Sequence, residues 1–317
     1  MNRLTGYRGY VVGLAFWALA LFLALEMGAA DHATVDIITK LRLPRALLAS
    51  AVGMGLAVSG CVLQALFANP LCEPYTLGIS SGAALGTVIG MALGVQFSFI
   101  GLAGTAFVGA MIFAVILFLV SLKQGSSNLI LLLTGVMLGV LGSSLVALWM
   151  TFADLNGVQG SLSWLLGDLS SARIGGSLMT LILVVILSGS LWFHWRELDA
   201  LLLGEEAARS LGFSIEGSRR KFILLTSLLV GLCVSGSGII GFVGLMVPHF
   251  ARKMVGSLHL KLVPLCAIWG AATLTFADMM SRSLFKPFEL PVGVMTAVIG
   301  APLFMWIMLR NEKKEAQ

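Results

Sequence analysis

The segment that decides the fold runs from Leu41 to Gly86 and reads LRLPRALLASAVGMGLAVSGCVLQALFANPLCEPYTLGISSGAALG. Its part from 46 to 67 is apolar and long enough to cross the hydrocarbon core of a bilayer. Small residues between 53 and 60 would let a second helix approach closely, as helices do inside membranes. Pro70 and Pro74 then end the helix, because proline has no backbone N–H to donate. The segment therefore predicts a membrane helix, a break and a second, Gly-rich helix.

The composition of the whole chain also indicates a membrane protein. Its 317 residues are 58% hydrophobic and only 11% charged, whereas a soluble domain is about 45–50% apolar and about 25% charged. This excludes a soluble single domain, and it excludes disorder, which needs the opposite composition. At about 20 residues per spanning helix, the apolar content allows roughly nine or ten helices. We therefore expect an all-α polytopic membrane protein.

Ten apolar segments can be marked along residues 1–317, which we expect to form a single transmembrane domain. They cover residues 9–27, 46–67, 77–95, 99–121, 129–152, 175–194, 222–239, 240–255, 262–281 and 290–309. An even number of crossings places both termini on one side. Most of the 20 Lys and Arg residues fall in loops on that side, which predicts cytoplasmic termini by the positive-inside rule. The outer exceptions include Arg42, Arg45 and Arg282.

Two short sequences suggest an inverted internal repeat. Residues 55–60 read GLAVSG and residues 231–236 read GLCVSG. Each is followed by a proline-containing break, at Asn69-Pro70 and at Pro248-His249, and in the expected topology the two segments cross in opposite directions. Inverted repeats with interrupted helices at matching positions are typical of transporters.

The longest hydrophilic stretch covers residues 195–221. Its part LDALLLGEEAARSLG has helical spacing and predicts two short helices that are separated at Gly204. Such a compact amphipathic loop on the cytoplasmic side indicates docking onto a partner. The alternative is a helix that lies at the membrane interface.

Several chemistries have no motif in the chain. There is no GxxxxGK[ST] sequence for ATP, and no GxSxG or HExxH sequence. The four cysteines form no CxxC pair, so we expect small buried side chains rather than a metal or redox site. No basic cluster is interleaved with aromatic residues, which argues against nucleic acid. We expect no catalytic residue, no metal and no cofactor in this chain, and energy supplied by a partner.

At this point the motifs resemble the FecCD-type family, which contains the permeases of ATP-binding-cassette importers for iron chelates, haem and cobalamin. The resemblance rests on residues 42–45, 53–64 and 69–83 of the opening segment, followed in order by four further stretches. These are LLLGEEAARSLG at 201–212, GIIGFVGLMVPHFAR at 238–252, Asp278 with Arg282, and ELPVGVMTAVIGAPLF at 289–304. The resemblance implies ten helices with both termini in the cytoplasm.

It also implies a function and a set of partners. The chain would be the permease subunit of an importer that moves a ferric siderophore or haem across the cytoplasmic (inner) membrane of a prokaryote, with cobalamin or another corrinoid as the alternative. A second permease subunit, as a homodimer, two ATPase subunits that bind ATP and Mg, and a periplasmic or lipoprotein substrate-binding protein would complete it in the lipid membrane. A sensory membrane protein without an ATPase partner is the competing class.

The resemblance assigns roles to four groups of residues. The binding protein would dock at Arg42, Arg45 and Arg282. The ATPase would contact Leu203, Gly204, Glu205, Glu206, Ala207, Arg209, Leu211 and Gly212. The pathway and its gate would involve Ser80, Ser81, Gly82, Ser126, Ser127 and Asn128. The structural motif residues are Gln64, Asn69, Pro70, Pro74, Pro248, His249 and Pro291.

Each role has a simpler alternative. The arginines could extend to lipid headgroups instead of docking a partner. The gate residues could form an ordinary tight turn. For His249 we favour a structural hydrogen bond beside a helix-breaking proline over substrate or metal ligation.

Overall fold

The computed structural model describes residues 3–28, 34–95, 101–123 and 127–315, and every element in them is helical. The N-terminal half contains α1 (Arg3–Glu26), α2 (Val35–Ile37), the π-helical turn η1 (Ile38–Arg42), α3 (Leu43–Leu66), the 3-10 turn η2 (Pro74–Leu77), α4 (Ile79–Ala92), α5 (Gly101–Ser121) and α6 (Asn128–Phe152). The C-terminal half contains α7 (Leu155–Leu165), α8 (Ile174–Phe193), α9 (Trp195–Leu202), α10 (Glu205–Ser210), α11 (Ile215–Ser237), α12 (Val243–Val255), α13 (His259–Ser283) and α14 (Val292–Glu315).

Among the described residues, seven helical segments are long and apolar enough to cross a membrane: α1, α2–α3 as one unit, α5, α6, α8, α11 and α13. Two shorter apolar helices, α4 and the described part of α14, accompany them. The segment predicted at 240–255 is α12, which has only 13 residues because residues 238–242 are not helical. The chain is therefore an integral membrane protein by the length and composition of its helices.

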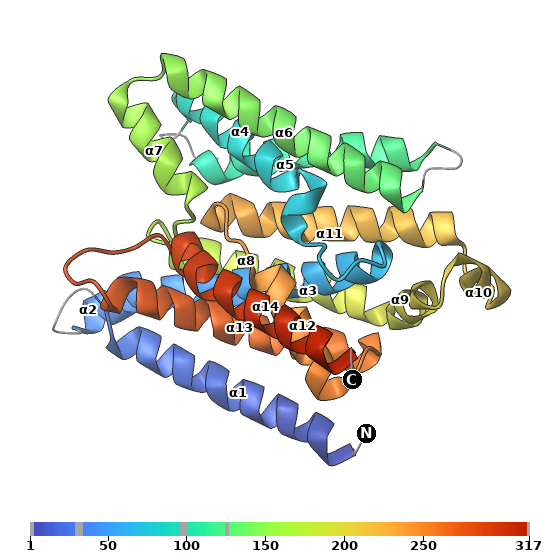
Figure 1. The fold of residues 1–317 in the computed structure, drawn as a ribbon. Coiled ribbons are helices and arrows are strands. Elements are labelled where there is room, and N and C mark those ends of the chain that lie inside the picture. Colours follow the sequence, from blue (N-terminus) through green and yellow to red (C-terminus); the bar gives the residue numbers. More distant parts are fainter. Residues whose placement is uncertain (1–2, 29–33, 96–100, 124–126, 316–317) are drawn as a thin grey trace.

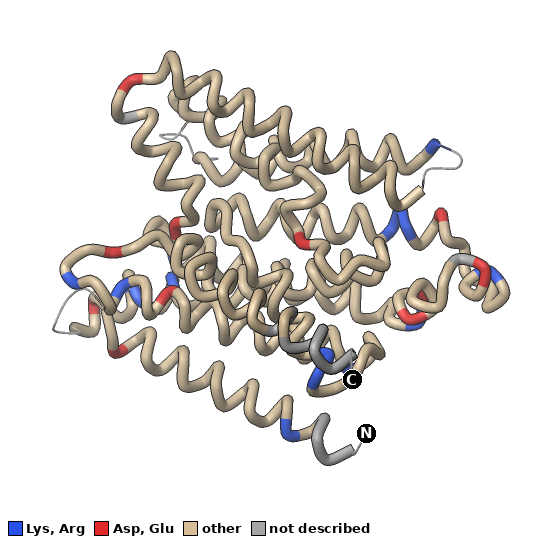
Figure 2. Tube along the Cα trace, viewed as in Figure 1, with Lys and Arg blue, Asp and Glu red and all other residues tan. Residues whose placement is uncertain are grey.

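Helix α3 lies at the centre of the molecule and is almost entirely buried. It packs against α8, α11, α12 and α13, while α4, α5 and α6 lie on one side of this core and α1 lies on the other (Figure 1). Both ends of the chain lie at the same end of the bundle as α9 and α10. We call this the α9–α10 end, and we call the opposite end, which carries α2, α7 and residues 284–291, the α7 end. The charged residues gather mainly at these two ends (Figure 2).

The helix predicted at 46–67 begins earlier than expected. It continues without a break from Val35 to Leu66, so Arg42 and Arg45 lie inside a helix and not in a loop before it. Pro44, in the first turn of α3, does not interrupt this continuous helix. Proline cannot donate to the carbonyl four residues earlier, and the π turn of η1 directly before it accommodates the missing hydrogen bond.

Two other boundaries differ from the sequence prediction for a local reason. Helix α7 was not expected, although Asp154 is an N-cap whose side chain accepts the backbone N–H of Gly157 at 2.9 Å. Helix α11 begins at Ile215 and not near 222, because Ser214 caps it in the same way through Gly217 at 3.1 Å. The stretch predicted as a loop over 195–221 therefore includes the first turns of α11. In both places the cap residue was visible in the sequence.

Small residues allow the close helix contacts that the sequence predicts. A Cβ atom on Gly53 would overlap the backbone carbonyl of Gly270 in α13, and a Cβ on Gly60 would overlap that of Gly244 in α12. Next to the first contact, the hydroxyl oxygens of Ser50 and Thr275 lie 2.9 Å apart. The predicted burial of Cys61, Cys72, Cys233 and Cys266 is also confirmed.

A methyl group at position 53 should destabilise the protein, because it would force α3 and α13 apart. For Gly53→Ala we expect a loss of roughly 1–3 kcal/mol, as for other overpacked cores. The matched control is Gly189→Ala in α8, whose added Cβ meets open space. That control should be neutral or gain up to about 1 kcal/mol in helix propensity. The thermal unfolding midpoint of the detergent-purified protein measures both, and equal midpoints would contradict this account of the α3–α13 contact.

Candidate functional site

Five charged side chains meet at the α7 end of the bundle. We call Arg42, Arg45, Asp278, Arg282 and Glu289 the arginine cluster. The Nε of Arg45 donates to Oδ1 of Asp278 at 2.8 Å and its Nη1 donates to Oε2 of Glu289 at 2.7 Å. The Nη2 of Arg282 lies 3.1 Å from Oδ2 of Asp278, one helical turn away on α13. The cluster therefore joins α3, α13 and the segment that precedes α14.

The arginines of the cluster also hold the end of α1. Arg42 Nη1 donates to the carbonyls of Leu25 at 2.8 Å and Glu26 at 2.7 Å, and Arg282 Nη2 donates to Ala24 at 3.3 Å. The last carbonyls of a helix have no partner inside it and carry its negative dipole end, so cations stabilise them. The cluster is thus the C-terminal cap of α1.

Most of the cluster is buried in this chain. Exposed fractions are 4% for Arg42, 9% for Arg45 and 3% for Arg282. Asp278 is fully buried, whereas the side chain of Glu289 is 41% exposed. The three predicted docking arginines are therefore brought together, but inside the helices and with internal partners, and Glu289 is the member that reaches the surface.

The predicted contact region for an ATPase is formed by α9 and α10. These are the two short helices that the sequence predicts, and Gly204 separates them with a φ of +95°. The buried Ala208 packs against Ala200 and Ile215 and so holds α10 on the bundle. Helix α10 begins at Glu205. Ala207 is half-buried, and Glu206 and Arg209 are exposed. Gly212 follows α10 with a φ of +85°.

The two most exposed leucines of this region are Leu203 and Leu211. The exposed fractions are 68% for Leu203 and 60% for Leu211. They lie at the α9–α10 end of the bundle, where charged residues gather (Figure 2). Exposed apolar side chains in a polar setting mark an interaction surface when they occur together.

The break between α3 and α4 packs on the break between α11 and α12. Gln64 joins the first break to the first turn of α12, because its Nε2 donates to the carbonyl of Cys72 at 3.3 Å and to that of Gly244 at 3.2 Å. Its Oε1 accepts Arg252 Nη1 at 2.6 Å. Non-helical backbone at membrane depth needs such partners inside the protein. These hydrogen bonds support the predicted structural role of Gln64.

The other predicted motif residues lie in or beside these breaks. Asn69 accepts the backbone N–H of Leu71 at 2.9 Å in a turn that leaves Pro70 exposed, and the buried Pro74 would touch a Cβ on Gly244. Pro248 is inside α12, and Pro291 directly precedes α14. The ring of His249 meets Phe304 edge-on at 5.8 Å, and its Nε2 has no hydrogen-bond partner among the described residues. The hydrogen bond expected for His249 at that nitrogen is thus not found in the described part of the chain.

The predicted gate and pathway residues occupy different places. Ser126 lies outside the described residues. Ser127 caps α6, and Asn128 Nδ2 donates to the carbonyl of Leu66 at 3.1 Å, which ties α6 to the end of α3. Ser80 and Gly82 face the interior of the bundle, whereas Ser81 lines a groove.

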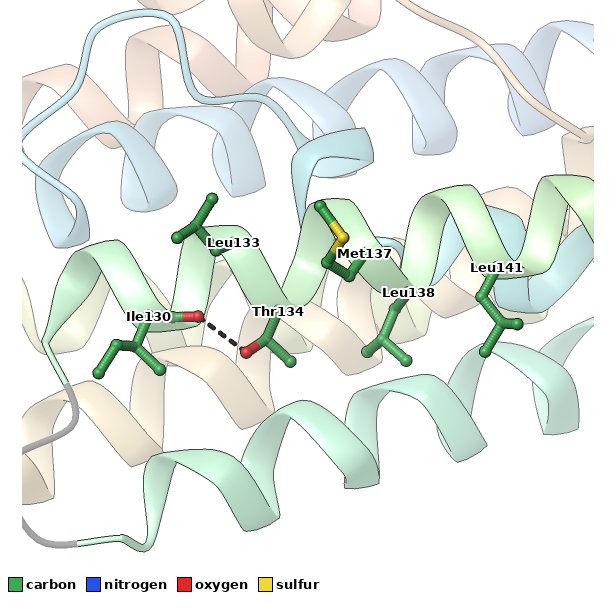
Figure 3. Close-up of a pocket in the computed structure, with 6 residues that line it drawn as sticks. All are labelled: Ile130, Leu133, Thr134, Met137, Leu138 and Leu141. Atoms are coloured by element: carbon green, nitrogen blue, oxygen red, sulfur yellow. Dashed lines mark hydrogen bonds between the residues drawn. The ribbon is translucent and has the colours of Figure 1, made fainter.

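That groove has a volume of about 440 Å³, and its lining combines apolar surface with several hydroxyl-bearing side chains. Thr76, Ser81, Ser143 and Ser144 carry these hydroxyls, whereas the hydroxyl of Tyr75, which also lines the groove, is buried. A second groove of about 390 Å³ lies along a different face of α6 and is mostly apolar (Figure 3). Its single hydroxyl, on Thr134, donates to the carbonyl of Ile130 at 2.8 Å. Helix α6 therefore borders one groove with several hydroxyl-bearing side chains and another that is mostly apolar.

Removal of the Asp278 carboxylate should destabilise the α7 end of the bundle. Asp278→Ala leaves the buried Arg45 and Arg282 without their shared counter-ion, and breaking a buried pair in this way costs about 3–5 kcal/mol. The control is Asp36→Ala, which breaks a pair with Lys40 whose side chains are 78% and 74% exposed and should cost less than about 1 kcal/mol. Denaturant titration of the purified protein measures both. Similar losses in the two variants would show that the cluster does not stabilise the fold.

Comparison with known proteins agrees with this architecture. A model of the FecCD transport family matches residues 10–310. The chain is 41% identical to the vitamin B12 import system permease protein BtuC of Vibrio parahaemolyticus, over 87% of this chain and 83% of the relative. It is 38% identical to the hemin transport system permease protein HmuU of Yersinia pestis, over 87% and 84%.

A solved structure has the same fold. It is described as an inward-facing conformation of a metal-chelate type ABC transporter, and it aligns with a TM-score of 0.87 and 32% identity over 95% of this chain and 98% of its own. The relatives are permease subunits and not enzymes, and ATP hydrolysis is carried out by separate ATPase chains. The chain belongs to the FecCD transport family and is a permease of the ABC transporter type.

Proposed function

We propose that this permease imports an iron chelate, a ferric siderophore or haem, across the cytoplasmic membrane of a prokaryote. The observation that carries the proposal is the groove beside α6, whose otherwise apolar lining includes the hydroxyl-bearing side chains of Thr76, Ser81, Ser143 and Ser144. Hydroxyl groups do not hold a bare cation tightly, since hard cations prefer carboxylate and carbonyl oxygens. They suit the passage of a large, already coordinated metal that is not retained. The hemin permease among the relatives supports this substrate class.

A corrinoid is the second candidate. It is favoured by the vitamin B12 permease among the relatives, whose identity to this chain is as high as that of the hemin permease. A corrinoid is also a bulky metal chelate, so the same weakly polar lining would serve it. In both cases selection of the substrate belongs to the binding protein that delivers it.

The transporter is proposed to contain two copies of this permease and two ATPase subunits. The ATPase would bind at α9 and α10, where Leu203 and Leu211 are exposed. Since the residues near them include Glu206 and Arg209, polar contacts would surround an apolar centre, as is usual for interfaces. This orientation places the α9–α10 end and both termini in the cytoplasm. The α7 end would then face outward.

The binding protein is proposed to dock at the α7 end, over Arg42, Arg45 and Arg282. Because Arg45 is already paired with Asp278 and Glu289, acidic groups of the partner would add to this network or exchange with Glu289, its exposed member. Arginine suits such a contact, since its guanidinium binds more than one carboxylate oxygen in fixed geometry.

Loss of the exposed leucines should release the ATPase. Leu203→Ala with Leu211→Ala removes two interface-type side chains, and central apolar contacts of this kind cost about 1–2 kcal/mol each. The control is Leu155→Ala in α7, which is 89% exposed at the opposite end of the bundle. Co-purification of the ATPase with the permease measures the effect. Full retention of ATPase by the double variant would contradict the assignment of this surface.

The substrate is tested by ATPase activity in proteoliposomes that contain the permease, its ATPase and its binding protein. We expect a ferric siderophore or haem to stimulate hydrolysis, whereas stimulation by cobalamin alone would favour the corrinoid alternative. In the same assay, Arg42→Glu with Arg45→Glu should remove stimulation, because it reverses the charge of the cluster. Since both side chains are buried, the loss is assigned to docking only if the variant keeps the thermal unfolding midpoint of the wild type. Lys40→Glu, at an exposed position of the same end, should retain it. A permease that binds no ATPase would support the sensory class.

A further inference from the structure

A single carboxylate joins α9 to the start of α13. Oδ1 of Asp199 accepts the backbone N–H of His259 at 2.8 Å and the Nδ1–H of its ring at 2.7 Å. His259 is 1% exposed and the side chain of Asp199 is 17% exposed. The residue at the N-cap position of α13 is Leu258, which has no side-chain oxygen. A carboxylate from another helix therefore provides the cap that α13 lacks, and it lies at the positive end of the helix dipole.

Helix α9 has a second anchor, which goes to a different helix. Glu197 accepts the hydroxyl of Ser218 at 2.7 Å and the Nζ of Lys221 at 2.8 Å, both on α11. Burial raises the pKa of Glu197, but the hydrogen bonds from Lys221 and Ser218 outweigh it and lower the pKa below its ordinary value. The two carboxylates thus attach α9 separately, one to α11 and one to α13.

Helix α13 connects this anchor to the opposite end of the bundle. It has 25 residues, which corresponds to about 37 Å. His259 is the first residue of α13, and Asp278 and Arg282 of the arginine cluster lie in its last two turns. Between them α13 is in direct contact with α3 at Gly270 and Thr275. Pro264 lies inside α13 and cannot donate to the carbonyl of Leu260, but Trp192 Nε1 donates to that carbonyl at 2.9 Å. Because cores packed this closely do not deform continuously, we expect a displacement at one end to be carried along the packed helix.

We propose that Asp199 is a positioning residue that passes displacement of α9 and α10 along α13 to the arginine cluster. The inference rests on the proposed function, since the displacement is supplied by an ATPase bound at Leu203 and Leu211. Without the Asp199 carboxylate, α9 stays attached to α11 through Glu197 and packed against α3, but it loses its hydrogen bonds to the start of α13. Asp199 therefore acts on communication between the two ends and not on ATP hydrolysis, which takes place in another chain.

The test measures a distance at the α7 end while nucleotide is trapped at the α9–α10 end. Spin labels are placed at Phe285→Cys and Leu155→Cys, which are exposed by 58% and 89%, in the assembled permease–ATPase complex. Vanadate trapping of ADP should change the label distance by about 2 Å or more, as in other helix displacements. In Asp199→Ala the change should be lost at the same amount of trapped nucleotide.

Two further variants separate positioning from folding. Asp199→Asn keeps an oxygen that accepts the backbone N–H of His259 and should retain the distance change. Glu197→Ala removes the α11 anchor only and should also retain it. An unchanged response in Asp199→Ala, or no response in the wild-type complex, would overturn the inference. If the wild-type permease traps no nucleotide because it binds no ATPase, the proposed function itself fails, and this outcome is distinct from the others.

Discussion

The close antiparallel contact between α3 and α13 is the interaction on which the other sites depend. Gly53 and Gly270 bring the two backbones together, and this fixes the register along both helices. Toward one end the register places Ser50 opposite Thr275, and then Arg45 opposite Asp278. In a membrane such contacts replace the hydrophobic driving force, because lipid tails are as apolar as the side chains they would replace. The same pair of glycines thus determines where the buried charges can be paired.

Irregular backbone inside the bundle obeys a related constraint. The breaks after α3 and after α11 leave carbonyls that cannot bond within a helix, and no water is present in a bilayer core to serve them. Gln64 meets this need for Cys72 in the first break. It also serves Gly244 in the first turn of α12, whose carbonyl Pro248 cannot bond, and Arg252 holds the amide in place. Because the first break and the start of α12 share one side chain, they form a single unit. The groove beside α6 lies next to this unit, since Tyr75 and Thr76 of the first break and Ser81 of α4 line it.

Local features of the fold could be predicted from the sequence, whereas long-range pairings could not. The small residues of α3, the proline breaks and the separation of α9 from α10 each follow from adjacent residues. The burial of Arg45 could not be predicted, because its partners Asp278 and Glu289 are 233 and 244 residues away. The cap of α13 by Asp199 was missed for the same reason. Helix α7 is different, since its Asp154 N-cap was visible and its short, amphipathic pattern resembled a loop.

The arrangement of the arginine cluster also has a consequence for how the protein is made. Arg42 and Arg45 are synthesised and inserted with α3, long before the carboxylates of Asp278 and Glu289 exist. During most of translation, the guanidinium of Arg45 lacks the two carboxylates that pair with it, and Arg282 has not yet joined Arg42 at the end of α1. The bundle can close at this end only when α13 arrives. The α7 end of the bundle is therefore the last to be completed. A chain whose synthesis stops before residue 278 lacks both carboxylates that pair with Arg45.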